Sequence, residues 1–295
     1  MKGATMNKVI NFHDVYDGDW FEETICYLKD KYNIISPADI IAFYHNGKSL
    51  KNSCLITVDD GDETFYKIMY PILKKHNIPA ILFVSPLIIL RKASNFWFQE
   101  IRNCERKNLI KYTISKINYI ENEKDDYKHN FFSQIRIDDL WKIINDYKGE
   151  FNIPYLESFN MDYNQLLEID RDGLVIIGAH TNWHPFLSQE TDRRSEQEIC
   201  QSIDELSKIL GHDILFFAYP NGRKGIDFGE REIKILEKTS VKIAFSTQPK
   251  NFIIKNNAYA VPRFGLSNGS LSFIKLKLFL GNYYKPIHNF FMTLK

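Results

Sequence analysis

The sequence predicts an α/β protein built on a parallel sheet or barrel. Runs rich in Val, Ile, Leu and Phe recur at residues 54–58, 80–84, 174–179 and 214–219, and segments with apolar residues at helical spacing lie between them. Continuous apolar runs are typical of strands buried on both faces, and their alternation with helices favours parallel pairing. The carboxyl ends of such strands meet at one edge, where α/β barrels carry their active sites.

The composition fits a globular protein. At 295 residues, with 44% hydrophobic and 14% aromatic residues, the chain can bury a substantial core. Its formal charge of +1 gives no electrostatic argument for a nucleic acid or an anionic membrane as partner. The four cysteines lie far apart without a Cys-x-x-Cys pair, so we interpret them as core thiols rather than as a zinc ribbon or a disulfide framework.

Neither a membrane span nor a secretory signal is visible. No apolar run approaches the length of a transmembrane helix, and the first residues lack the apolar core of a signal peptide. Taken as written, the sequence predicts a cytoplasmic protein. A chain that begins after a removed signal would look the same and would be extracytoplasmic.

The first elements follow a strand-and-helix order. Residues 9–12 form the first predicted strand and residues 20–28 the first helix. A second helix opens at Ser36 and Pro37, because serine caps helix N-termini and proline suits the first helical position. After the strand at 54–58, another helix is predicted before the strand at 80–84.

The middle of the chain changes character. Residues from about 91 to 165 are rich in Lys, Asn, Tyr and Phe and predict a mainly helical insertion in a single domain that spans residues 1–295. The strand-and-helix alternation then resumes. We expect the next helix to open with a capping box at Ser195 and Glu198 and to end at Gly211.

Two adjacent carboxylates, Asp59 and Asp60, follow the strand at 54–58, and Gly61 permits a turn there. The chemical interpretation gives them separate tasks, one binding a cation and the other staying free as a base. Unshielded like charges so close together would otherwise raise one pKa strongly. The alternative is a solvated Asp-Asp-Gly turn.

A histidine pair, His180 and His184, follows the strand at 174–179. In one turn of helix this spacing puts both imidazoles on the same face, where they can grip one cation while a carboxylate from elsewhere completes the set. Two ordinary polar residues are the alternative. The position at a strand end, like that of Asp59 and Asp60, favours the metal site.

Three motifs therefore end predicted strands in a fixed order: TVDDG at residues 57–61, HTNWH at 180–184 and FAYPNG at 217–222. Together they resemble the polysaccharide deacetylase family, also called the NodB-homology family or carbohydrate esterase family 4. The resemblance covers nearly the whole chain, including residues 11–15 and 78–84. It implies a distorted (β/α)₇ barrel that binds a divalent metal, usually zinc.

The resemblance also implies roles for individual residues. Asp60, His180 and His184 correspond to the metal ligands and Asp59 to the catalytic base. The backbone N–H of Asn221 corresponds to the donor that stabilises the tetrahedral oxyanion. The residues around Asn221 also fit a plain tight turn.

Two features of the family pattern are missing. Many members carry an arginine where this chain has Ala218, and that arginine pairs with the base. Arg263, on a later strand, could supply the charge, and an ordinary surface arginine is the alternative. The usual late Leu-x-His, which supplies the general acid, is not visible either. His13 is the candidate for that role, with a structural histidine as the alternative.

The sequence thus predicts a metal-dependent carbohydrate deacetylase. It would hydrolyse an N-acetyl group, or in second place an O-acetyl group, on an amino sugar of a polysaccharide or glycan precursor. Trp183 and Tyr219 are the candidate substrate contacts, since aromatic faces bind sugar rings, although such residues more commonly pack in cores. A small-molecule amidase with the same metal site, a glycan-binding protein of impaired activity and a structural role stay open.

Overall fold

A curled sheet of parallel strands forms the centre of the molecule. The computed structural model describes residues 6–117 and 131–281. Seven strands follow one another in the order β7-β6-β5-β4-β3-β1-β8, and β2 pairs with β3 off this path. Every ladder is parallel, which confirms the predicted architecture. The strands are β1 (Lys8–Phe12), β2 (Asn33–Ile34), β3 (Ser53–Val58), β4 (Ala80–Val84), β5 (Val175–Ala179), β6 (Phe216–Ala218), β7 (Ile243–Phe245) and β8 (Phe264–Gly265).

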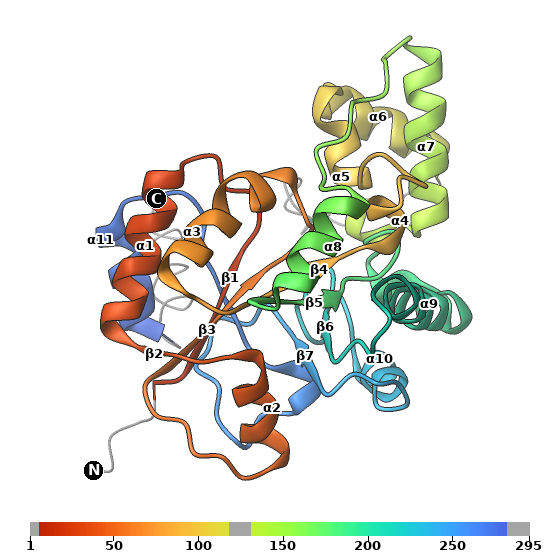
Figure 1. Ribbon diagram of the computed structural model, residues 1–295. Helices are drawn as coiled ribbons and strands as arrows, with labels where there is room; N and C mark the ends of the chain where they lie inside the picture. Colours follow the sequence, from red (N-terminus) through yellow and green to blue (C-terminus); the bar gives the residue numbers. More distant parts are fainter. Residues whose placement is uncertain (1–5, 118–130, 282–295) are drawn as a thin grey trace.

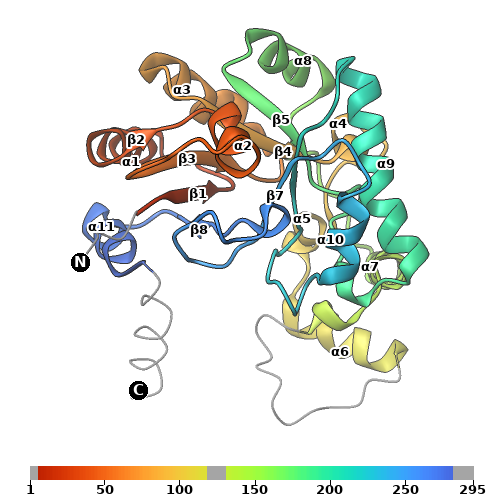
Figure 2. The same ribbon diagram turned by 90° about the horizontal axis from the view of Figure 1, so that it is seen from below.

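Helices cover the outside of this sheet. Figures 1 and 2 show α1 and α3 along one side and α9 and α10 along the other, and in Figure 1 α2 lies below the strands. In the described part of the chain, no helix combines the length and the hydrophobicity that a membrane span needs. The helices are α1 (Gly18–Lys31), α2 (Pro37–His45), α3 (Tyr70–His76), α9 (Asp192–Leu210), α10 (Glu230–Leu236) and α11 (Leu271–Leu280).

The capping signals of the sequence were right at two helix ends and wrong at one. Ser36 caps α2 in a capping box, and Gly211 ends α9 with φ 76°. The start of α9 was wrong, because the helix begins at Asp192 with Thr191 as its cap. Ser195 therefore lies inside the helix, where its hydroxyl donates to Glu232 Oε1 over 2.8 Å.

One segment closes the sheet into a distorted barrel. At one end of the segment, Val261 forms a parallel bridge with Phe245 of β7. At the other end, Phe264 of β8 pairs with Ile10 of β1. Arg263 lies between these two contacts and is fully buried. The closing segment therefore brings a charged side chain into the interior.

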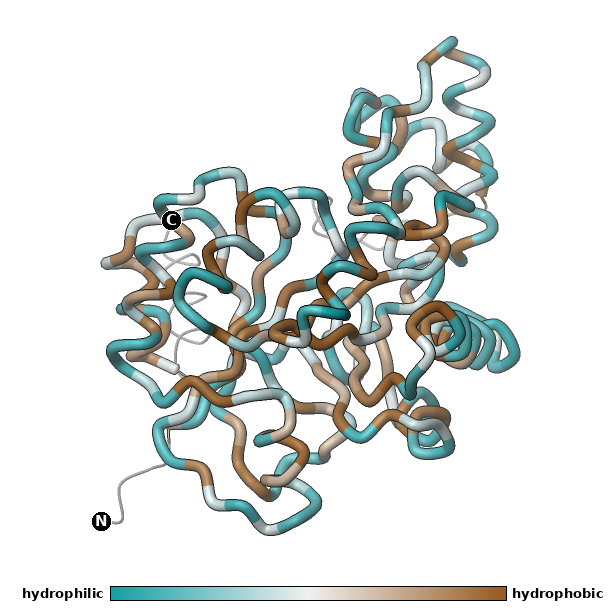
Figure 3. Tube along the Cα trace, in the orientation of Figure 1, coloured by the Kyte–Doolittle hydropathy of each residue, from teal (hydrophilic) through white to brown (hydrophobic). Residues whose placement is uncertain are grey.

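Apolar residues fill both the barrel and the layer between barrel and helices. On β4, Phe83 belongs to the interior cluster, whereas Leu82 and Val84 belong to the cluster under the helices. This division follows from the alternation of side chains along a strand. Ile40 of α2 joins the interior cluster, so α2 covers the amino end of the barrel. In Figure 3 the hydrophobic colours follow the strands through the centre of the molecule.

The connection from β4 to β5 is mainly helical. Three of its helices, α5, α6 and α7, stand beside one end of the sheet (Figure 1) and share an apolar cluster of their own, which includes Leu109, Leu140 and Ile144. This connection contains the predicted insertion, at about residues 91–165, and residues 118–130 lie outside the described residues. Its helices are α4 (Pro86–Ile89), α5 (Trp97–Glu100), α6 (Arg106–Lys116), α7 (Ile137–Glu150) and α8 (Tyr163–Asp172).

Gly178 is required for the close approach of β4 and β5. A Cβ atom at this position would lie 2.5 Å from Cε1 of Phe83 and 3.0 Å from the carbonyl oxygen of Phe216. We expect Gly178→Ala to lower the free energy of unfolding by about 1–3 kcal/mol in urea titrations, because the interior has no room for the methyl group.

Gly149→Ala is the matched control, since a Cβ there meets nothing within 4 Å and the residue lies in α7. It should raise the free energy of unfolding by about 0.5–1 kcal/mol. Equal stability of Gly178→Ala and the wild type would contradict this account of the packing.

Candidate metal centre and active site

One carboxylate and two imidazoles meet at the carboxyl ends of β3 and β5. Asp60, His180 and His184 are buried, and one ligand atom from each lies within 4.8 Å of the others. Nε2 of His180 is 3.4 Å from Oδ1 of Asp60, and Nε2 of His184 is 3.7 Å from the same oxygen. Parallel pairing through β4 brings these residues together, because all three strands end at the same edge.

Left-handed backbone turns position the three side chains. Asp60 has φ 73°, Thr181 φ 61° and His184 φ 55°, in a region that non-glycine residues rarely adopt. The sequence argument for the histidines was wrong in this respect, since it assumed helical geometry and residues 180–184 instead form a bent loop. The rings nevertheless lie 5.0 Å apart between centroids. Such strained conformations cluster at functional sites.

The cluster has the donor atoms that a divalent cation requires. Nδ1 of His180 donates to the carbonyl oxygen of Ala218 over 2.7 Å, so the lone pair of Nε2 is directed toward Asp60. Among the described residues, Oδ1 of Asp60 and Nδ1 of His184 have no hydrogen-bond partner, although both are buried. Buried polar atoms normally have one. The residues therefore fit a metal ion bound by one oxygen and two nitrogens.

The protonation states of His184 and Asp60 suit this interpretation. Burial lowers the pKa of His184 to about 4, so its imidazole is neutral at pH 7, the form that binds metals. Burial alone would raise the pKa of Asp60, but the imidazoles of His180 and His184 beside its carboxylate outweigh it and hold that pKa well below its usual range. Asp60 is therefore ionised.

Asp59 faces the barrel interior, as alternation along β3 requires for the neighbour of Asp60. Its two carboxylate oxygens accept from Arg263, Nη1 to Oδ1 over 2.7 Å and Nη2 to Oδ2 over 2.8 Å. Nδ2 of Asn11 donates to Oδ2 over 3.0 Å. Burial alone would raise the pKa of Asp59, but the charge of Arg263 outweighs it and lowers that pKa. Asp59 is therefore a fixed, ionised carboxylate.

Arg263 is held from several sides. Its Nη1 also donates to Oδ1 of Asn11 over 3.0 Å, and its Nε donates to the carbonyl oxygen of Ser246 over 3.2 Å. The guanidinium lies over the rings of Phe83 and Phe245, at 5.6 and 5.7 Å from their centroids. Arg263 is thus an interior residue with an exposed fraction of 0%.

A cavity of about 520 Å³ opens onto the metal cluster. His13 lies at its edge, half exposed, with Nε2 3.9 Å from Oδ2 of Asp59. The ring of Phe98 packs against that of His184, with 4.8 Å between centroids. One side of the cavity thus belongs to the barrel and the other to the β4–β5 connection. The lining includes His13, Asp60, His184 and Asn221, the aromatic residues Trp97, Phe98, Phe132 and Phe186, and the basic residues Arg102 and Arg106.

The structure brings only some of the remaining candidates to this cavity. Asn221 lines it and has φ 59°. Tyr219 does not, because it is fully buried, stacks on Phe228 at 3.6 Å between centroids and donates its hydroxyl to the carbonyl oxygen of Tyr259. Trp183 lines a second cavity instead.

Sequence reasoning missed two supporting residues. Asn11 bridges Asp59 and Arg263, and its signals in the sequence were its position on a predicted strand and its place in the motif of residues 11–15. Glu198 holds the histidine loop, because its Oε2 accepts the backbone N–H groups of Asn182 and Trp183 over 3.0 and 2.9 Å. The sequence instead predicted a capping box of Ser195 and Glu198.

Comparison with known proteins identifies the class. The family model for polysaccharide deacetylases matches residues 46–104 and 134–245, which is more than half of the chain. The chain belongs to the polysaccharide deacetylase family, as the motif resemblance indicated. The matched ranges contain Asp59, Asp60, both histidines of the cluster and Asn221, but neither His13 nor Arg263.

Curated relatives include poly-beta-1,6-N-acetyl-D-glucosamine N-deacetylases from Staphylococcus aureus. The protein of strain MRSA252 is 24% identical over 249 residues, which are 84% of this chain and 66% of the relative. The chain therefore spans about two thirds of the length of the curated relatives that it matches.

Solved structures establish the same fold. The structure of IcaB from Ammonifex degensii superposes with a TM-score of 0.63 at 19% identity and covers 93% of this chain and 97% of that one. The Streptococcus pyogenes deacetylase PplD in complex with acetate superposes with a TM-score of 0.61 at 18% identity and covers 92% and 97%. These likenesses confirm the distorted barrel.

The ion pair between Asp59 and Arg263 generates a stability prediction. Arg263→Gln should lower the free energy of unfolding at about pH 7 by about 3–5 kcal/mol in urea titrations, because it leaves a buried carboxylate without its partner. The folded-state pKa of Asp59 is lowered, so the pair stabilises the fold above the unfolded pKa of about 3.9 and this stabilisation is lost on acidification.

In the variant, protonation of Asp59 removes the unpaired buried charge. The difference from the wild type should therefore shrink as the pH falls from about 7 to about 5. Lys67→Gln, which removes an exposed ion pair with Glu63, is the control and should cost less than about 1 kcal/mol. A loss for Arg263→Gln as small as that of the control would contradict the interior role of Arg263.

Proposed function

We propose that this protein removes N-acetyl groups from an amino sugar of a polysaccharide by metal-dependent hydrolysis. The observation that carries the proposal is an ionised, oriented carboxylate, Asp59, directly beside a buried cluster of one carboxylate and two imidazoles, in which Oδ1 of Asp60 and Nδ1 of His184 lack partners. Family membership and the N-deacetylases among its relatives support the same chemistry. Those relatives are named for a polymer of N-acetylglucosamine, so a glycan of this class is the proposed substrate.

Asp60, His180 and His184 are the proposed metal ligands, and zinc is the proposed ion because one carboxylate and two imidazoles are a typical zinc donor set. A divalent ion supplies Lewis acidity at such a site and lowers the pKa of water beside it. Glu198 keeps the histidine loop in place through its two backbone hydrogen bonds.

Asp59 is the proposed base that takes the proton of the attacking water. Arg263 holds this carboxylate ionised and fixes its direction, replacing the arginine that many relatives carry at the position of Ala218. The water oxygen bonds to the acetyl carbon, and we assign the backbone N–H of Asn221 to the oxyanion that forms. His13 then donates a proton to the leaving nitrogen as the C–N bond breaks, which gives acetate and a free amine.

The aromatic side of the cavity suits a sugar substrate. Trp97, Phe98 and Phe132 line the cavity that opens onto the metal cluster, and aromatic rings pack against the apolar faces of pyranoses. We also propose that α5, α6 and α7, which share their own apolar cluster, are an insertion in one barrel domain. This insertion would then supply one wall of the active site.

Metal binding gives the first test. After exposure to zinc and desalting, the wild-type protein should retain about one zinc ion per chain by mass spectrometry, and Asp60→Ala and His184→Ala should retain none. Asp59→Asn is the matched control, because it changes the neighbouring carboxylate and should keep the metal. The absence of zinc from the wild type would overturn the ligand assignment.

The role of Asp59 is tested by turnover. Asp59→Asn should release acetate from a β-1,6-linked N-acetylglucosamine oligomer about 10²- to 10⁴-fold more slowly than the wild type with zinc still bound, because the amide cannot accept the proton. Circular dichroism melting should show whether the variant is folded. Turnover at the wild-type rate would sink the assignment of the base.

The role of His13 is tested by the pH profile. His13→Ala should lower kcat with zinc in place and remove the alkaline limb of the profile, because that limb reports deprotonation of the general acid. The side chain is half exposed, so the substitution should leave stability nearly unchanged. An alkaline limb identical to that of the wild type would assign His13 a structural role.

A further inference from the structure

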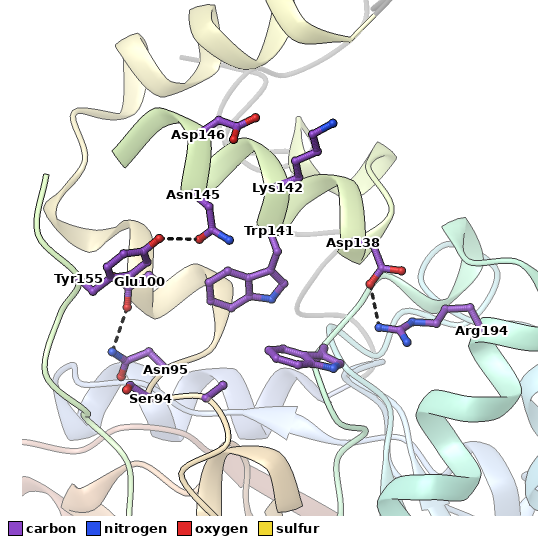
Figure 4. A pocket seen from close by; sticks show the side chains of 12 residues that line it. Ser94, Asn95, Glu100, Asp138, Trp141, Lys142, Asn145, Asp146, Tyr155 and Arg194 are labelled. Carbon is purple, nitrogen blue, oxygen red and sulfur yellow. Dashed lines mark hydrogen bonds and ion pairs between the residues drawn. The ribbon is translucent and has the colours of Figure 1, made fainter. Parts of the chain in front are cut away.

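A second cavity, of about 810 Å³, lies between helix α7 and the loop that carries the two histidines. None of its lining residues lines the metal cavity. Helix α5 separates the two, because Phe98 faces the metal cavity while Glu100 faces the second one. Figure 4 shows Trp141, Asn145 and Tyr155 around this space. The proposed reaction leaves the cavity without a role.

The walls combine aromatic surface with fixed polar groups. Trp141 of α7 meets Trp183 of the histidine loop edge to face, with 5.8 Å between ring centroids. The hydroxyl of Tyr155 donates to Oδ1 of Asn145 over 3.0 Å, which turns the amide nitrogen of Asn145 away from Tyr155 (Figure 4). Aromatic faces beside oriented hydrogen-bonding groups match a pyranose, which has apolar C–H faces and a polar rim.

The charges in the cavity favour an uncharged ligand. Glu100, the buried carboxylate at its inner wall, already pairs with Lys148 and accepts from Nδ2 of Asn95 over 3.1 Å. Asp138 pairs with Nη2 of Arg194 over 2.9 Å. Asp146 and Lys142, the two other charged residues of the lining, carry opposite charges, so the cavity offers no net negative charge to an ammonium group. A sugar that still carries its N-acetyl group therefore fits better than its deacetylated, cationic form.

We propose that this cavity is a second glycan-binding site, which holds an N-acetylated hexosamine unit of the same polymer, away from the unit that is hydrolysed. The choice of sugar rests on the proposed function. Trp183 is adjacent to His184 in sequence, and its backbone N–H donates to Oε2 of Glu198. Oε1 of Glu198 in turn lies 3.3 Å from Nη2 of Arg194. A sugar in the cavity thus contacts the same loop that carries two proposed metal ligands.

Direct binding tests this proposal in the full chain. The zinc-loaded Asp59→Asn protein is titrated calorimetrically with a β-1,6-linked N-acetylglucosamine hexamer. Adding Trp141→Ala should raise Kd about fivefold or more, because it removes one aromatic wall. Tyr155→Ala, at an exposed position, should also weaken binding and covers the case in which the tryptophan variant fails to fold. Phe279→Ala on α11, another exposed aromatic residue, is the control and should leave Kd unchanged.

The outcomes separate this proposal from the proposed function. An unchanged Kd in both Trp141→Ala and Tyr155→Ala would overturn the second site, even if the wild type releases acetate. Binding that depends on Trp141, without acetate release by the wild type, would support the site and refute the deacetylase. Equal affinity for the fully de-N-acetylated hexamer would overturn the preference for an acetylated, uncharged unit.

Discussion

The ion pair between Asp59 and Arg263 is the constraint that fixes the proposed base and ties the closing segment to the barrel. Two charges buried in a barrel interior are costly, and the attraction between them offsets that cost only when their geometry is good and their remaining hydrogen bonds are satisfied. Here the pair is bidentate. Asn11 also donates to the carboxylate of Asp59, and the carbonyl oxygen of Ser246 accepts from Nε of Arg263. The same contact that joins the closing segment to the barrel therefore also fixes the proposed base.

The metal cluster depends on a different kind of support. Its three side chains are held by left-handed turns at the ends of β3 and β5, and such turns persist only where surrounding contacts impose them. Gly61 at one turn lies so close to β4 that a Cβ would meet Cγ1 of Val84 at 2.9 Å. At the other turn, Glu198 binds two backbone N–H groups. The rigidity of the cluster thus comes from the sheet on one side and from helix α9 on the other.

The sequence predicted the strands and their common edge, which depend on the periodicity of apolar residues. It did not predict the side-chain contacts that depend on tertiary packing. Buried strands in a parallel sheet need continuous apolar runs, so β3, β4 and β5 were identified and their polar ends expected at one edge. The left-handed turn between the histidines could not be foreseen, because neither Thr181 nor His184 favours that conformation by itself. The motif around Tyr219 did not show whether its ring faces the cavity or, as found, the core. For the same reason, the sequence did not decide whether Arg263 pairs with Asp59 or lies on the surface.

The closure of the barrel by residues 261–265 sets an order for assembly. Asp59 and its partner are 204 positions apart, and bringing such distant residues together costs loop-closure entropy, which organisation of the intervening chain reduces. Until residues 261–265 pack against β7 and β1, the carboxylate of Asp59 lacks the guanidinium of Arg263 and the barrel stays open between these two strands. Completion of the proposed catalytic site therefore coincides with completion of the barrel, so a partly folded chain exposes its carboxylates without being able to use them.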